Sequence, residues 1–148
     1  MKILVTGGCG FIGANFVLHM IESDPQCEIV NFDALTYAGN LGNLASIADN
    51  LRHQFVRGDI CAKSDVEAVL DSSIDAVVHF AAESHVDRSV EGPDVFLRTN
   101  ILGTQLLLER MRQLGRGRFV MIAGDVVRGF RRCARGHWMR QRQHVGGR

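Results

Sequence analysis

Lysine and tyrosine are scarce in this chain of 148 residues, which contains two lysines, Lys2 and Lys63, and one tyrosine, Tyr37. No apolar run approaches the roughly 18 residues that a membrane-spanning helix needs, so we expect no membrane segment. The apolar run after Lys2 gives way to glycine after three residues, so we expect no secretory signal peptide. The four cysteines form no Cys-x-x-Cys pair, so we expect buried thiols in the reducing cytoplasm.

Acidic residues are equally scarce at the C-terminal end of the chain. Residues 110–148 carry eleven arginines and a single acid, Asp125, whereas residues 1–109 carry six basic and fifteen acidic residues. The formal net charge of +1 therefore hides a change of chemical character within one short chain.

This change predicts one domain and a tail. Residues 123–148 hold seven arginines and five glycines with no sustained period of 2 or 3.6. We expect them to be disordered or loosely associated with a domain at residues 1–122. The eleven arginines of residues 110–148, with Phe130 and Trp138 among them, could also hold a nucleic-acid backbone. Non-specific attraction to polyanions is the favoured interpretation of this tail.

The most informative stretch is Lys2–Gly13, KILVTGGCGFIG. A short apolar strand, a glycine turn and a helix from Phe11 follow one another, which is the opening of a dinucleotide-binding βαβ unit. One glycine permits a positive φ, one lets the backbone approach a pyrophosphate, and one lets the helix pack closely on the strand. The helix N-terminus offers unpaired N–H groups to the phosphates. Two frames fit, Gly8-x-Gly10-x-x-Gly13 and Gly7-x-x-Gly10-x-x-Gly13.

A carboxylate follows the second predicted strand. Asp33 comes directly after Glu28–Phe32 and 26 residues after Gly7, close to where a first βαβ unit places an acid against the adenosine ribose. A carboxylate there accepts hydrogen bonds from the ribose hydroxyls and repels a 2′-phosphate, so NAD is favoured over NADP. The alternative is that Asp33 only caps the turn that follows it.

The rest of the chain alternates strands with helices. Further strands are expected at Gln54–Arg57, Ile74–Phe80 and Phe119–Ile122, and helices at Leu41–Asp49, Lys63–Leu70 and Pro93–Arg112. Ser64 is the expected N-cap of the helix at Lys63–Leu70. The alternation predicts an α/β fold, a Rossmann-like doubly wound parallel sheet of about five strands in the order 3-2-1-4-5.

Five motifs together resemble one family: TGGCGFIG at 6–13, DALTYAGNL at 33–41, GDI at 58–60, AAESHVDRS at 81–89 and TNILGT at 99–104. This family is the dTDP-glucose 4,6-dehydratases, which are extended members of the short-chain dehydrogenase/reductase superfamily. The glycine motif is common to the superfamily, whereas DALTYAGNL and AAESHVDRS are far more specific. The match covers roughly residues 1–122, the cofactor half of such an enzyme.

The resemblance implies a binding site for NAD and for dTDP-glucose. The turn at Phe11 and Ile12 would hold the pyrophosphate, and Ser84 would touch both the cofactor and the substrate. Asp33 to Thr36 would hold the adenosine ribose, Asp59 and Ile60 would flank the adenine, and Phe80 to Ala82 would line the nicotinamide side. The implied cofactor-binding residues are Gly7, Gly10, Phe11, Ile12, Gly13, Asp33, Ala34, Leu35, Thr36, Asp59, Ile60, Phe80, Ala81, Ala82, Ser84 and Thr99.

The implied reaction is an internal redox elimination. NAD takes a hydride from C4 of the glucosyl unit, water is eliminated, and the hydride returns to C6 to give dTDP-4-keto-6-deoxyglucose. Such enzymes need a tyrosine with a lysine four residues later, but Tyr37 is followed at that spacing by Leu41. The family's Thr-Asp-Glu run corresponds to Gly124, Asp125 and Val126, so Asp125 is the one catalytic residue that remains. We therefore expect an inactive, truncated cofactor-binding portion, with a tail that is out of frame or otherwise unrelated to the family.

Other interpretations stay open. A nucleotide-sugar epimerase shares the fold and the glycine turn, although the two specific motifs favour the dehydratases. His79, His85 and Asp87 lie close in sequence but lack an established ligand spacing, so we expect no metal site. Full members of the family are typically homodimers that pair through two helices per subunit. Residues 93–112 would supply only one of these helices, which argues against a dimer of this chain.

Overall fold

The computed structural model describes residues 1–84, 93–123, 126–132 and 138–140. Its centre is one sheet of seven strands in the order β3-β2-β1-β4-β5-β6-β7. The first five strands in this order pair in parallel, so the predicted order 3-2-1-4-5 is confirmed. They are β1 (Lys2–Thr6), β2 (Glu28–Asp33), β3 (His53–Arg57), β4 (Ala76–His79) and β5 (Arg118–Ala123).

β1 lies in the interior of the sheet because both of its faces are apolar. Leu4 pairs with Val30 of β2 on one side and with Val77 of β4 on the other. Ile3 and Val5 belong to one hydrophobic cluster, whereas Leu4 belongs to a second one. Successive side chains of a strand point to opposite faces, so each face of the sheet has its own core.

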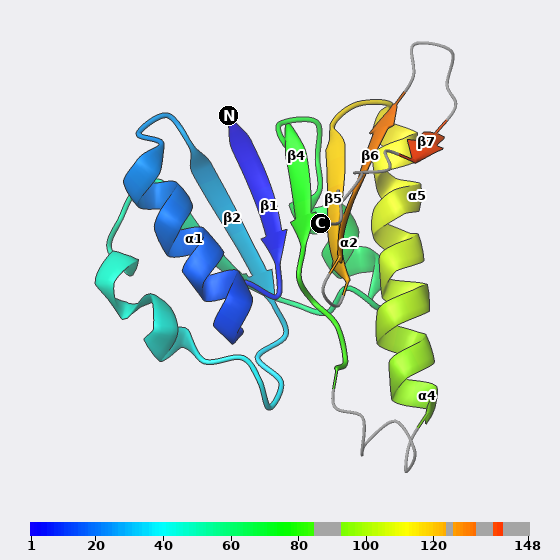
Figure 1. The fold of residues 1–148 in the computed structure, drawn as a ribbon, viewed down its shortest axis with the longest axis horizontal. Coiled ribbons are helices and arrows are strands. Elements are labelled where there is room, and N and C mark those ends of the chain that lie inside the picture. The colour runs from blue at the N-terminus through cyan, green and yellow to red at the C-terminus, as the bar shows by residue number, and fades with distance from the viewer. Residues whose placement is uncertain (85–92, 124–125, 133–137, 141–148) are drawn as a thin grey trace, which may run out of the picture.

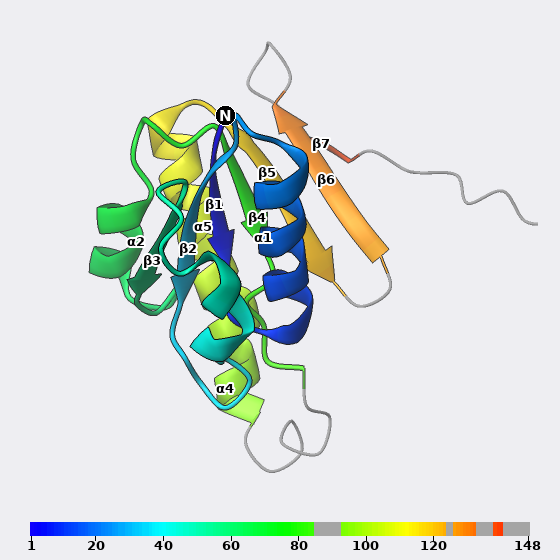
Figure 2. The same cartoon turned by 90° about the vertical axis from the view of Figure 1, so that its left-hand side faces the viewer.

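Helices cover both faces of the sheet (Figures 1 and 2). Val17 of α1 and Leu44 of the 3₁₀ helix η1 pack in the cluster on one face. Val66 of α2 and Leu107 of α5 pack in the cluster on the opposite face. The helices are α1 (Phe11–Ser23), η1 (Leu41–Ile47), α2 (Lys63–Val69), α4 (Pro93–Phe96), η2 (Leu97–Gly103) and α5 (Thr104–Leu114).

Two details of the helices differ from the sequence predictions. The helix expected at Pro93–Arg112 is present as α4, η2 and α5, and η2 has π-helical hydrogen bonding that apolar spacing does not reveal. Ser64 does not cap α2, because the N-cap is Ala62 and makes no side-chain bond. The Ser64 hydroxyl lies instead 3.2 Å from Oδ1 of Asp65.

The C-terminal tail adds two antiparallel strands to the sheet, β6 (Val126–Arg132) and β7 (Trp138–Arg140). The sequence predicts no regular structure for residues 123–148, whereas the structure has these two strands there. The physical reason is that β5 would otherwise present a free edge of N–H and C=O groups, and β6 begins with two β-branched valines. Asp125 lies outside the described residues, and the domain boundary after residue 122 stays a prediction.

The described part of the chain also bears on the cysteines and on membrane contact. Cys9 and Cys27 are buried free thiols, and Cys61 is a partly exposed one. Burial, with a smaller contribution from the charge of Asp33, raises the pKa of Cys9 to about 11, so this thiol stays protonated at neutral pH. None of the helices in the described ranges is long and apolar enough to cross a membrane.

Candidate functional site

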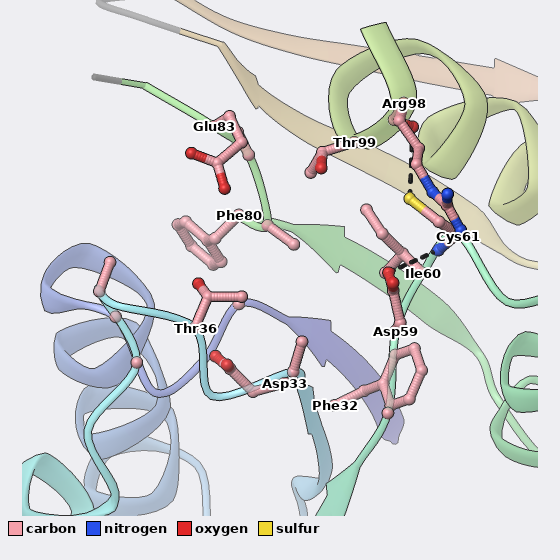
Figure 3. A pocket seen from close by; sticks show the side chains of 18 of the residues that line it. Phe32, Asp33, Thr36, Asp59, Ile60, Cys61, Phe80, Glu83, Arg98 and Thr99 are labelled. Carbon is pink, nitrogen blue, oxygen red and sulfur yellow. Dashed lines mark hydrogen bonds between the residues drawn. The ribbon is translucent and has the colours of Figure 1, made fainter. Parts of the chain in front are cut away.

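A cleft of about 290 Å³ opens beside the carboxyl ends of β1, β2, β3 and β4 (Figure 3). This is the edge at which open parallel sheets bind their ligands. Most of the predicted cofactor-binding residues line the cleft, namely Gly7, Gly10, Asp33, Ala34, Thr36, Asp59, Ile60, Phe80, Ala81, Ala82 and Thr99.

The remaining predicted residues are Phe11, Ile12, Gly13, Leu35 and Ser84, and their atoms do not line the cleft. The side chains of Phe11 and Ile12 are 82% and 63% exposed, and the backbone N–H groups of both residues lie in the first turn of α1. Gly13 lies behind the glycine turn, where it packs on Gly7. Asp125 is not among the described residues, so its predicted role is untested.

The structure adds cleft residues that were not predicted to bind the cofactor: Phe32, Ala38, Gly39, Gly58, Cys61, Glu83, Val95 and Arg98. Several are sequence neighbours of predicted residues, and Gly58 and Cys61 flank Asp59 and Ile60. Val95 lies four residues before Thr99, so helical spacing could have identified it. Arg98 is the only cationic side chain among the described residues that line the cleft.

The glycine turn after β1 is shaped by close backbone contacts. Gly7 has a φ of +71°, and a Cβ on it would lie 2.5 Å from the backbone nitrogen of Ala81. A Cβ on Gly13 would collide with the carbonyl oxygen of Gly7, so α1 packs directly against the turn. Gly8 does not line the cleft, whereas Gly7 and Gly10 do. The frame Gly7-x-x-Gly10-x-x-Gly13 therefore accounts for this geometry.

The N-terminus of α1 opens at the same turn. Gly10 is the N-cap residue, and no side chain caps the helix. The first intrahelical bond runs from the N–H of Ala14 to the carbonyl oxygen of Gly10, over 2.8 Å, which leaves the N–H groups of the first turn without helical acceptors. A Cβ on Gly10 would lie 3.4 Å from the nearest other atom, so the fold itself has room there. The open space and the free N–H groups suit an anionic ligand.

Asp33 ends β2 with a buried carboxylate at the cleft (Figure 3). Its Oδ2 accepts the backbone N–H of Cys9 at 2.9 Å, which ties it to the glycine turn. Its Oδ1 accepts the backbone N–H of Leu35 at 2.8 Å and so supports that residue at a φ of +53°. Each carboxylate oxygen has a further lone pair, so capping the turn and accepting a hydroxyl are compatible.

The end of the cleft next to β3 is formed by Asp59 and Ile60 (Figure 3). The Oδ1 of Asp59 accepts the backbone N–H of Cys61 at 2.8 Å. Ile60 is buried, and a Cβ on Gly103 of η2 would lie 2.6 Å from it, so the helix approaches this loop closely. The loop thus offers an apolar wall beside a carboxylate.

The other end is formed by Phe80, Ala81 and Ala82, which follow β4. The ring of Phe80 contacts that of Phe16 in α1, with 5.3 Å between the ring centroids. Asn100 of η2 holds the next residue, Glu83, because its side chain accepts the Glu83 N–H and donates to the Glu83 carbonyl, both at 2.9 Å. The backbone of this loop is therefore fixed to the π-helical segment.

Beneath this loop, His79 is buried in a chain of hydroxyl groups. Its Nδ1 lies 2.6 Å from the Thr6 hydroxyl, and its Nε2 lies 3.0 Å from the Thr104 hydroxyl. The Thr104 hydroxyl donates to the carbonyl of Asn100 at 2.8 Å, so we assign the histidine proton to Nε2 and an acceptor role to Nδ1. Desolvation lowers the pKa of His79 to about 4, so the ring is neutral at physiological pH.

These contacts make His79 a core histidine. Both of its ring nitrogens are engaged by threonines, which leaves neither for a metal ion. No group of three or more potential metal ligands occurs within the described parts of the chain. His85 and Asp87, the other two residues considered for a metal site, lie outside those parts.

The free energy of unfolding should fall as the pH is lowered from 6.5 to about 4, because only the unfolded chain then takes up a proton on His79. The full effect of this one group is about 3 kcal/mol. Desolvation lowers the pKa of His53 as well, which acts in the same direction. Urea unfolding across this pH range should show a flatter dependence in His79→Gln than in the parent. A slope in His79→Gln equal to that of the parent would contradict the assignment.

Solved structures share this fold. A dTDP-glucose 4,6-dehydratase from Streptomyces venezuelae, solved with NAD, matches with a TM-score of 0.76 and 47% identity over 80% of this chain and 38% of that one. A UDP-glucose 4-epimerase from Thermus thermophilus, also solved with NAD, matches with a TM-score of 0.68 and 34% identity over 78% of this chain and 35% of that one. The chain is therefore of the class of Rossmann-type dehydratases and epimerases.

The family is shown by the sequence comparison. A model of the GDP-mannose 4,6 dehydratase family matches residues 4–131, and the chain belongs to this family. The dTDP-glucose 4,6-dehydratase of Escherichia coli is 53% identical over 118 residues, which are 79% of this chain and 32% of the relative. The low-salt glycan biosynthesis protein Agl12 of Haloferax volcanii is 46% identical over 129 residues, 87% of this chain and 41% of the relative. The predicted resemblance is confirmed, and the chain spans only about a third to two fifths of the length of these relatives.

Proposed function

We propose that the cleft binds NAD and that the chain is the NAD-binding portion of a dTDP-glucose 4,6-dehydratase, which is a lyase. The observation that carries this proposal is the convergence of three groups at one cleft: the glycine turn, the uncapped N-terminus of α1 and the carboxylate of Asp33. These groups fit the diphosphate and the ribose of a dinucleotide. When bound, NAD would supply transient oxidation at C4 of the sugar.

Different residues around the cleft bind different parts of the dinucleotide. The N–H groups at Phe11 and Ile12 donate to the pyrophosphate, and Asp33 accepts from the ribose hydroxyls. The loop from Asp33 to Thr36 holds the ribose, and Asp59 and Ile60 flank the adenine. Phe80 to Ala82 and Thr99 surround the nicotinamide end, and Ser84 is the residue proposed to touch both cofactor and sugar nucleotide.

We further propose that this chain alone does not turn over. It has no tyrosine with a lysine four residues later. Val126 stands where the family has the glutamate that acts as the catalytic base. Loss of one proton-transfer group costs about 10²–10⁴-fold in rate, and here several are absent together. Asp125 stays the one proposed catalytic acid.

The alternatives are less well supported. The solved dehydratases are 42% to 47% identical to this chain and the epimerases 30% to 34%, which favours the dehydratase. A role of the basic tail in binding nucleic acid concerns residues that lie largely outside the described ones.

A homodimer and a cytoplasmic location stay predictions. The exposed apolar side chains of Leu97 and Ile101 on η2 would be the pairing surface.

Calorimetric titration of the purified chain with NAD tests the proposal. We expect saturation at one NAD per chain, because the cleft offers one diphosphate position, and no conversion of added dTDP-glucose. Deletion of residues 123–148 should leave NAD binding intact, whereas nucleic-acid binding would vanish with the deletion and weaken steeply with salt. Folded chain that ignores millimolar NAD would refute the proposed site, and robust dehydration would refute the proposed inactivity.

A further inference from the structure

A hydrogen bond spans the dinucleotide cleft from one loop to another. The hydroxyl of Tyr37, in the loop after β2, donates to Oε2 of Glu83, in the loop after β4, over 3.2 Å. In the sheet, β1 lies between β2 and β4, so the bond passes across the carboxyl end of β1. The glycine turn begins at this point. The bond therefore joins the two rims that flank the proposed diphosphate position.

Both ends of this bond are anchored. The loop that carries Tyr37 is fastened to the glycine turn, because the backbone N–H of Asn40 and the side-chain amide of Asn43 both donate to the Cys9 carbonyl at 3.0 Å. The loop that carries Glu83 is fastened to η2 by the paired bonds with Asn100. Because both backbones are already ordered, the bond costs little further conformational entropy.

The bond also lies on the solvent side of the site. Tyr37 is 47% exposed and Glu83 is half-buried, whereas Asp33 beneath them is buried. A dinucleotide with its ribose at Asp33 and its nicotinamide at Phe80 to Ala82 must cross the end of β1 between the two loops. Its central diphosphate would then run beneath the bond.

We propose that Tyr37 and Glu83 form a strap that closes over the bound dinucleotide and slows its release. This role rests on the proposed NAD binding and goes beyond it, because it assigns the kinetics of release to a contact between two loops that need not touch the cofactor. A mononucleotide such as AMP occupies one end of the cleft only and does not pass beneath the strap.

The test is the dissociation rate of NADH from the full chain, measured by stopped-flow displacement with excess NAD and followed by NADH fluorescence. Tyr37→Phe removes only the hydroxyl and should raise the dissociation rate about 2- to 10-fold, as expected for one hydrogen bond. Glu83→Ala should raise it similarly. The double variant should add nothing further, because both substitutions remove the same contact.

Two controls separate a strap from a general loss of structure. Ser73→Ala removes another exposed bond between a hydroxyl and a carboxylate, at 2.6 Å from Asp71 and outside the cleft, and should leave the NADH dissociation rate unchanged. The affinity for AMP should be equal in the parent and in Tyr37→Phe. Unchanged NADH dissociation in both strap variants, or a parallel loss of AMP affinity, would overturn the strap and leave NAD binding standing. A parent chain that binds no NADH would overturn the strap and the proposed function together.

Discussion

Gly13→Ala should lower the free energy of unfolding by about 3 kcal/mol, at the upper end of what overpacking of a core costs. The added methyl group would collide with the carbonyl oxygen of Gly7 and would lie 2.8 Å from the Cα of Gly8. These are backbone atoms, which cannot rotate away as a side chain can, so α1 would have to move off β1. Urea unfolding followed by circular dichroism measures the loss. It is a large share of the roughly 5–15 kcal/mol by which a small domain is stable.

Gly10→Ala is the matched control, because it adds the same methyl group to the same turn. Gly10 has a φ of −74°, and its methyl group would meet only ordinary contacts, the nearest at 3.4 Å. This variant should unfold like the parent but bind NAD at least about tenfold more weakly, because the methyl group enters the space of the diphosphate. If Gly13→Ala is as stable as the parent, the close packing of α1 is not required. If Gly10→Ala binds NAD normally, the diphosphate does not approach this residue.

The parallel part of the fold could be predicted because its signals are local. An apolar strand, a glycine turn and a helix define the first unit, and right-handed crossovers then fix the order of the strands that follow. The strand bounds were less certain, since Ile74–Phe80 has the apolar composition of a strand but only Ala76–His79 pairs as β4. Ile74 lies instead at the end of a turn, where its backbone N–H donates to the carbonyl oxygen of Asp71.

The features that the sequence did not predict depend on contacts between distant segments. Glu83 became a cleft residue because Asn100 fixes its backbone, a pairing that no local pattern encodes. Arg98 reaches the cleft from η2 because Gly103 lets that helix approach Ile60. The strand β6 forms against the edge of β5, and β7 in turn pairs with β6.

Asp33→Asn should weaken NAD binding by about 10- to 100-fold, because hydrogen bonds to a charged acceptor contribute about 1.5–3 kcal/mol. The substitution removes the negative charge and one of the two acceptor oxygens. It should also reduce the preference for NAD over NADP, because an amide no longer repels a 2′-phosphate. Titration of the parent and the variant with NAD and with NADP measures both effects.

The decisive comparison is with Asp24→Asn, because Asp24 makes the same kind of turn contact away from the cleft. Its Oδ1 accepts the backbone N–H of Gln26 at 2.9 Å, just as Oδ1 of Asp33 accepts that of Leu35. Asp24→Asn should therefore show the effect of the turn contact alone and leave NAD affinity unchanged, whereas Asp33→Asn also affects the bond from the Cys9 N–H. If Asp33→Asn loses stability but binds NAD as tightly as the parent, then Asp33 only caps its turn. The ribose would then be recognised elsewhere, because Asp33 would serve only its own contacts with Leu35 and Cys9.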